Sequence, residues 1–127
     1  MTPKKFDNRQ FQYESDAWKR SLAFLLEENL ILKHRLAELI RENRMLSDLL
    51  DVAEEYQNRF IRNDEIINLM RLDIAGFDKL LIKDIYEDGS LMKGLIRKQK
   101  KLRREFKMLE VAFNELKTQF NHLATSL

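Results

Sequence analysis

Basic residues are concentrated in one short run, and side chains of this type bind phosphate groups. Lysine and arginine neutralise the phosphates of nucleic acids, and basic clusters also bind anionic lipid surfaces. The run therefore offers a candidate site for nucleic acid, for an anionic membrane surface or for an acidic protein. Its seven basic residues are Arg97, Lys98, Lys100, Lys101, Arg103, Arg104 and Lys107.

Apolar residues at heptad spacing pass through this basic run. Leu95 and Leu102 are seven residues apart, and all seven basic residues avoid heptad positions a and d. In a basic leucine zipper the basic helix precedes the zipper and carries no seam residues, so the run does not have that organisation. A solvated helix face is the favoured interpretation, ahead of an acidic protein partner. Nucleic acid or membrane binding ranks last.

Residues that could support catalysis or bind a metal ion are scattered. The sequence has no cysteine, and neither His34 nor His122 has the Glu three residues earlier that di-iron helical bundles use. Most carboxylates fall at outward-facing positions, and the sequence has no glycine-rich phosphate loop. We therefore predict a protein that is not an enzyme and uses no metal or cofactor.

The composition indicates long helices. Charged residues make up 35% of the 127 residues, and the chain has only three Gly and one Pro, at position 3. Such a chain is expected to form long helices packed side by side, which predicts the all-α class. The net charge of +2 is too small to indicate a polyanionic partner by itself.

The sequence has no segment that predicts membrane insertion or secretion. Its longest uninterrupted apolar run, from Leu22 to Leu26, is too short to span a membrane. The first ten residues contain two lysines but no apolar core behind them, unlike a secretory signal. We predict a cytoplasmic protein without a transmembrane segment.

A leucine zipper pattern runs through the first half of the chain. Leucine recurs every seven residues at heptad position d, and two asparagines occupy position a. The pattern predicts one helix from about residue 8 to about residue 62 that needs a partner, because a long helix with a bare leucine seam is not stable alone. We assign the seam of a dimer to Trp18, Leu22, Leu25, Asn29, Leu32, Leu36, Leu39, Asn43, Leu46 and Leu50.

The two asparagines favour parallel pairing of two copies. In a parallel, in-register dimer each residue at position a meets its own copy, so Asn29 and Asn43 can each hydrogen-bond to their twins. In an antiparallel pair an unpaired buried amide would cost about 1–3 kcal/mol. Glu28 at position g could also reach Lys33 at position e of the partner. We therefore predict a parallel homodimer, with an antiparallel dimer and an up-down bundle within one chain as the alternatives.

Two further patterns concern the ends of the first helix. Asp7 and Gln10 have the spacing of a capping box, with Phe6 and Phe11 placed as a hydrophobic staple around it. At the other end, the segment 63–65 reads either as a helix break with a new cap or as a stutter in a continuous helix.

The second half of the chain predicts a helical hairpin. Residues 66–86 are apolar nearly all round, so this helix is expected at the centre of a bundle, and residues 88–90 read as a turn. A second heptad series follows the turn, with leucine at position d and phenylalanine at three a positions. The predicted architecture is an elongated all-α coiled coil. It has a capped long helix over 1–62 and an antiparallel hairpin over 63–127, and two copies form a four-helix bundle in a parallel homodimer.

Four apolar residues fall outside the seam of the first helix. They occupy heptad positions b and c, so a two-stranded coil would leave them in water. Contiguous exposed apolar surface marks contact sites, although the same residues would be core if more than two helices shared the seam. The candidate docking residues are Ala23, Phe24, Leu30 and Ile31.

Together, these patterns predict a non-enzymatic oligomerisation or scaffold module that binds another protein through its helical surfaces. The alternatives are a nucleic-acid-associated protein that uses the basic run 97–107, and a protein that binds anionic membrane surfaces.

Overall fold

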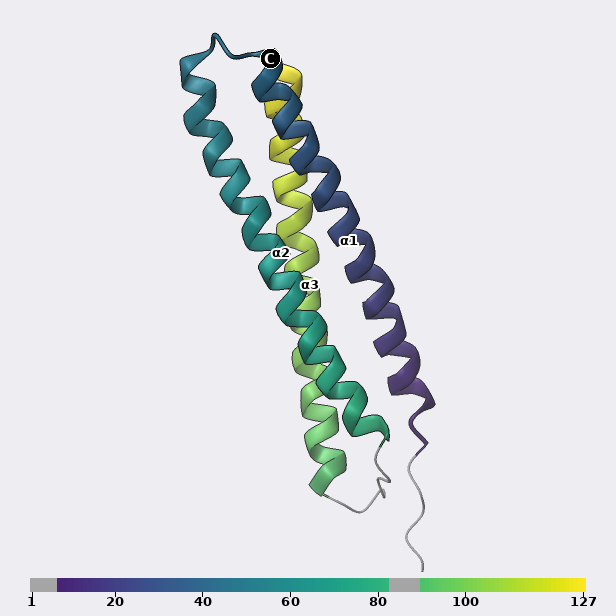
Figure 1. Ribbon diagram of the computed structural model, residues 1–127. Coiled ribbons are helices and arrows are strands. Elements are labelled where there is room, and N and C mark those ends of the chain that lie inside the picture. Colours follow the sequence, from purple (N-terminus) through teal and green to yellow (C-terminus); the bar gives the residue numbers. More distant parts are fainter. Residues whose placement is uncertain (1–6, 83–89) are drawn as a thin grey trace, which may run out of the picture.

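The computed structural model describes residues 7–82 and 90–127, apart from the side chain of Ser90. Within these ranges the chain forms three α-helices and no strand, which confirms the predicted all-α class (Figure 1). The helices are α1 (Arg9–Glu42), α2 (Ser47–Ile82) and α3 (Ser90–Ser126). The predicted turn at 88–90 lies at the edge of the segment outside the described residues.

The predicted continuous helix over residues 8–62 is wrong, because α1 ends at Glu42 and α2 begins at Ser47. Asn43 ends α1: its backbone N–H and its side-chain Nδ2 both donate to the carbonyl of Leu39, at 3.1 and 2.9 Å. Asparagine is favoured after a helix end, and Asp48 provides an acidic residue in the first turn of α2. Beyond this loop, α2 runs through residues 63–65 without a break.

The predicted capping box at the start of α1 is also wrong. Asn8 is the N-cap residue and makes no side-chain capping bond; its Nδ2 atom donates instead to the carbonyl of Leu81, at 2.6 Å. Asp7 accepts from the backbone N–H and the guanidinium of Arg9. Phe6, the other half of the predicted staple, lies outside the described residues. The start of α1 is therefore tied to the end of α2 across the fold.

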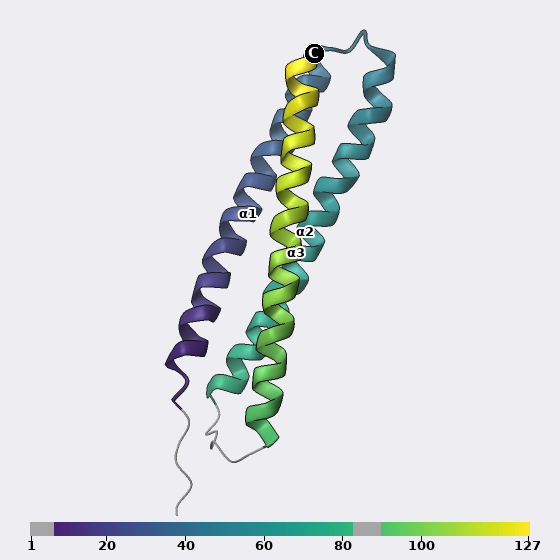
Figure 2. The ribbon, with the colours of Figure 1, turned by 180° about the vertical axis from the view of Figure 1, so that it is seen from behind.

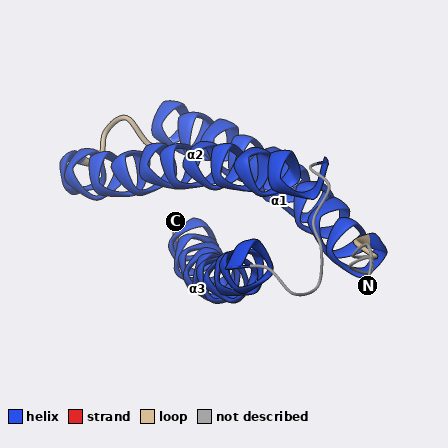
Figure 3. Cartoon of the chain, turned by 90° about the horizontal axis from the view of Figure 1, so that it is seen from below, coloured by secondary structure: helices blue, strands red, loops and turns tan. Residues whose placement is uncertain are grey.

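The three helices lie side by side. The chain turns back between α1 and α2, and α3 runs in the same direction as α1, so that its C-terminal end lies beside the end of α1 (Figures 1 and 2). Seen along the helices, α3 lies against one side of the α1–α2 pair (Figure 3). One hydrophobic core joins all three, with fully buried side chains at Leu22 in α1, Phe60, Ile67, Ile74 and Phe77 in α2, and Phe113 and Phe120 in α3.

The predicted dimer seam lies inside this core. Its residues from Trp18 to Leu39 are each 8% exposed or less, and they pack in one cluster with residues of α2 and α3. Leu46 and Leu50, beyond the end of α1, are 48% and 56% exposed. The structure therefore differs from the predicted parallel pairing, because the seam meets helices of its own chain. The heptad pattern has the same physical cause in both cases: a leucine stripe must be buried by another helix.

Polar residues interrupt the α1–α2 interface at two levels. Ser15 Oγ donates to Asp78, which also pairs with Lys19. Two heptads further along α1, Asn29 Nδ2 donates to Asp64 Oδ1 and to the carbonyl of Phe60, each at 2.8 Å, and Asp64 pairs with Lys33. The predicted contact of Asn29 with its own copy is thus replaced by a contact with α2. Asn29 Oδ1 is buried and has no hydrogen-bond partner among the described residues.

The apolar helix expected at the centre is buried on one side only. In α2 the residues Ile67, Met70 and Ile74 are in the core, whereas Leu69 and Leu72 are 63% and 69% exposed. The chain provides two neighbours for α2, and they leave its outer face uncovered.

Candidate protein-binding groove

Helices α1 and α3 are joined by two ion pairs in the same register. Arg103 donates to both carboxylate oxygens of Glu14, at 2.7 and 2.8 Å, and Lys117 Nζ donates to Glu28 Oε1 at 2.7 Å. Both pairs join residues that are 89 positions apart, so they lie two heptads apart on parallel helices. The side-chain hydrogen bonds with Glu14 raise the pKa of the Arg103 guanidinium, which therefore stays charged.

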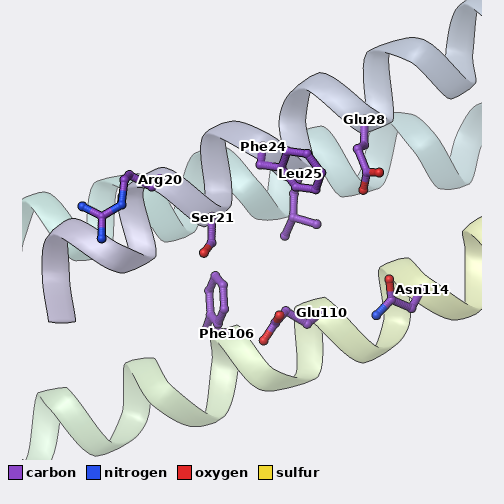
Figure 4. Close-up of a pocket in the computed structure, with 8 residues that line it drawn as sticks. All are labelled: Arg20, Ser21, Phe24, Leu25, Glu28, Phe106, Glu110 and Asn114. Atoms are coloured by element: carbon purple, nitrogen blue, oxygen red, sulfur yellow. The ribbon is translucent and has the colours of Figure 1, made fainter.

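The level between these ion pairs carries no such pair. The same register places Ser21 opposite Glu110, and a serine hydroxyl is too short to repeat the contact made by Glu14 and Glu28. A cleft of about 310 Å³ opens there between α1 and α3 (Figure 4). We call this cleft the α1–α3 groove; it is lined by Arg20, Ser21, Phe24, Leu25, Glu28, Phe106, Glu110 and Asn114.

The groove has an apolar centre and a polar rim. In Figure 4 the Phe106 ring rises from α3 toward Ser21, and Leu25 points down from α1 into the space between the helices. Phe24 is 59% exposed at the edge of this space. Arg20, Glu110 and Asn114 supply charged and amide groups around it. An apolar strip with a charged margin is the kind of surface that receives the apolar face of an amphipathic helix.

The four candidate docking residues are all exposed, and three of them line two different clefts. Phe24 borders the α1–α3 groove, whereas Ala23 and Leu30 line a second cleft, between α1 and α2. Ile31 is 59% exposed. Sequence reasoning found Phe24 but missed Phe106 and Glu110 on α3. The signal that could have found them is the spacing of the ion pairs. Each ion pair joins residues that are 89 positions apart, and at the same spacing Glu110 lies opposite Ser21, which has no charge.

The seven residues of the basic run lie in the first half of α3; Lys98 is half-buried and the other six are exposed. Arg103 pairs with Glu14, and Lys101 Nζ lies 3.7 Å from Glu105 Oε1. The other five make no ion pair with any residue that the structure describes.

Neither a metal site nor a membrane span is present in residues 7–82 and 90–127. These residues contain no group of three or more His, Asp or Glu side chains placed to hold a metal ion, and no helix long and apolar enough to cross a membrane. The predicted cytoplasmic location stays a prediction.

Comparison with known proteins adds no relative. The sequence matches no protein family model, and no curated protein or solved structure is significantly similar to it. The residues themselves therefore carry the functional argument.

Proposed function

We propose that this protein is a non-enzymatic helical module that binds an amphipathic helix of another protein in the α1–α3 groove. The observation that carries the proposal is the gap in the interhelical ion pairs at Ser21 and Glu110. The shared core holds α1 and α3 side by side, with an ion pair on either side of the gap, so the groove is present before a partner arrives. A preformed site lowers the ordering cost of binding.

The residues of the groove define the partner that it would accept. Phe24, Leu25 and Phe106 would contact apolar residues spaced three and four apart on one face of the partner helix. Glu110 has no ion-pair partner among the described residues, so it favours a lysine or arginine beside that apolar face. A partner helix in this position would lie against both α1 and α3 and complete a four-helix arrangement around the existing core.

The scaffold role follows from the same surface. The zipper seam is occupied within the chain, so association with other molecules must use outer surfaces. The α1–α3 groove offers exposed aromatic surface and the unpaired carboxylate of Glu110. Aromatic residues at the centre of a contact contribute most of its binding energy.

A synthetic probe helix tests the proposal. The probe is an amphipathic peptide of three heptads with leucine at positions a and d and lysine at e and g, titrated into the isotopically labelled full chain. We expect amide shift changes at residues 20–28 and 106–114. Phe24→Glu should weaken binding about 30-fold or more, because it removes a central aromatic contact and places a carboxylate beside leucine.

The control is His34→Glu, an exposed change on α1 outside the lining of the groove, which should leave the affinity within about twofold. A probe with glutamate in place of lysine should bind more weakly to the unmodified chain, because it repels Glu110. Equal binding by the Phe24→Glu variant, or shift changes confined to the helix ends, would contradict the proposed groove.

A further inference from the structure

A second exposed face, formed by α2 and α3, has an apolar centre. A cleft of about 420 Å³ lies between these helices, and its apolar lining is Ile66, Leu69, Met70, Met108, Leu109 and Ala112. Leu69 and Met108 are 63% and 71% exposed. We call this surface the α2–α3 face. It is distinct from the α1–α3 groove, because none of the residues that line the two clefts is shared.

Opposite charges lie at the two ends of the α2–α3 face. The first turns of α2 carry an acidic cluster, and the first half of α3 carries three cations at matching heptad positions, c and f. All six are exposed, and the one ion pair that any of them makes with a described residue is the 3.7 Å contact of Lys101 with Glu105. The acidic cluster is Asp48, Asp51 and Glu55, and the basic cluster is Arg97, Lys101 and Arg104.

Both clusters point to the same side of the molecule. Arg59 donates to Gln119 across the α2–α3 interface at 2.8 Å, and both residues occupy heptad position g in the numbering set by the buried residues of their helices. Position c lies next to g on the outer surface of a helix, and position f lies beside c. The clusters therefore flank the outer side of the α2–α3 face, with the apolar cleft between them.

The spacing of the clusters can be read from the helix register. Lys98 Nζ lies 3.2 Å from the place of a Cβ on Gly76, and Gln119 meets Arg59, so the basic cluster lies at the level of residues 70–81 of α2. The acidic cluster is then about 37 Å away, at 1.5 Å per residue. The midpoint falls near residue 64, at the end of the apolar cleft that Asn63 and Ile66 line. The apolar cleft, lined in α2 by residues from Asn63 to Asp73, begins at this midpoint and extends toward the basic cluster.

We propose that a second copy of this chain docks antiparallel on the α2–α3 face, with the two-fold axis passing near the apolar cleft. Such an axis turns one copy end for end, so the acidic cluster of each copy meets the basic cluster of the other. The acidic cluster lies on α2 and the basic cluster on α3, and neighbouring helices are 8–10 Å apart. A crossing angle of about 30° between the two molecules brings α2 of one copy over α3 of the other at each end of the interface. A parallel pair would keep each cluster at its own level, away from the opposite charge.

This dimer goes beyond the proposed function, since it leaves the α1–α3 groove of each copy free. Its two grooves would allow one dimer to hold two partner helices. The interface has an apolar centre and a charged margin, which is the usual distribution in protein contacts. Because its charges are exposed, we expect association to weaken as the salt concentration rises.

Charge reversal combined with mixing tests the dimer. In sedimentation experiments on the full chain, we expect a dimer at about 50 mM salt and mostly monomer at about 0.5 M. Lys101→Glu with Arg104→Glu should weaken dimerisation at least about tenfold, and so should Asp51→Lys with Glu55→Lys. Mixing these two variants should restore a 1:1 dimer, because each carries the charge that the other needs at both contacts.

The basic run supplies a matched control. Lys100→Glu with Lys107→Glu makes the same change in net charge, but both residues occupy position b, on the side of α3 toward α1. This variant should dimerise like the unmodified chain. Leu69→Glu with Met108→Glu should be monomeric at every salt concentration, with its helical circular dichroism unchanged.

Three results would overturn the proposal: a monomer at low salt, failure of the mixed variants to associate, or equal loss in the Lys100 and Lys107 control. Equal loss in that control, together with retention of a single-stranded oligonucleotide by the unmodified chain, would point instead to phosphate binding by the whole basic run. Phe24→Glu should leave the dimer intact, so failure of the dimer and failure of the groove are separate outcomes.

Discussion

Helix α1 uses two faces in opposite ways. Against α2 it buries a leucine seam, and two polar layers, at Ser15 and Asn29, fix the pairing by hydrogen bonds to Asp78 and Asp64. Against α3 the shared core is supplemented at the exposed edge by the ion pair of Glu28 with Lys117 and the equivalent pair of Glu14 with Arg103. Buried polar layers fix the first interface, whereas the edge of the second carries exposed ion pairs and opens into the α1–α3 groove between them.

The difference shows how one chain can combine a specific fold with a free surface. A buried polar group is costly without its hydrogen-bond partner. If α2 shifted by one heptad along α1, Ser15 would lie opposite Arg71 and Asn29 opposite Gln57, and the hydrogen bonds to Asp78 and Asp64 would be lost. Exposed ion pairs add little stability, and the gap at Ser21 therefore costs little. Leaving the α1–α3 interface open at this level is a small loss in stability, which is why it can serve binding.

Truncating a side chain on each face of α1 gives the largest expected contrast. Leu22→Ala removes a fully buried side chain and should lower the free energy of unfolding by about 2–5 kcal/mol. Phe24→Ala, two residues away and 59% exposed, should change it by no more than about 0.5 kcal/mol. Urea titration followed by circular dichroism measures both. Similar losses for the two variants would mean that the groove is core and not a free surface.

A pair of double-mutant cycles compares the polar contacts of the two interfaces. The coupling of Asn29 with Asp64, measured by alanine substitution, should be about 1–2 kcal/mol, because the asparagine is fully buried. The coupling of Glu28 with Lys117 should be under about 1 kcal/mol, since these side chains are 22% and 40% exposed. Raising the salt concentration should reduce the second value much more than the first. A larger coupling energy for Glu28 with Lys117 than for Asn29 with Asp64 would show that contacts with α3 fix the position of α1.

The sequence predicted the helices better than their partners. The leucine seam and the absence of internal proline were enough to predict an all-α chain and the burial of residues such as Leu25 and Leu36. They could not specify which helix covers the seam, because a stripe of leucine is buried equally well by another copy or by α2. Asn29 was predicted to pair with its own copy, whereas its side-chain partner in the structure is Asp64 of α2.

The break after Glu42 explains the main difference between prediction and structure. Asn43 was assigned to the seam because it keeps the heptad spacing, and the same residue is also well suited to end a helix. Local spacing alone does not distinguish these roles. The α1–α3 groove depends on this break, because only after the chain turns back can α3 lie parallel to α1. No pattern within α1 could therefore predict it.

Adding the missing ion pair between α1 and α3 tests whether the gap at Ser21 is a binding site, and it has the smallest expected effect on stability. Ser21→Lys places a cation opposite Glu110, where the register of Glu14 and Glu28 leaves a gap. We expect the free energy of unfolding to rise by only about 0.3 kcal/mol, because the new pair would be exposed. Binding of the probe helix should nevertheless fall about tenfold, since the lysine fills the groove and neutralises the carboxylate that attracts the probe. Ser21→Gln, of similar length but uncharged, separates these two causes: it should reduce binding by filling the groove, without the gain in stability. If Ser21→Lys stabilised the fold and left probe binding unchanged, the gap would be only a missing ion pair and not a binding site.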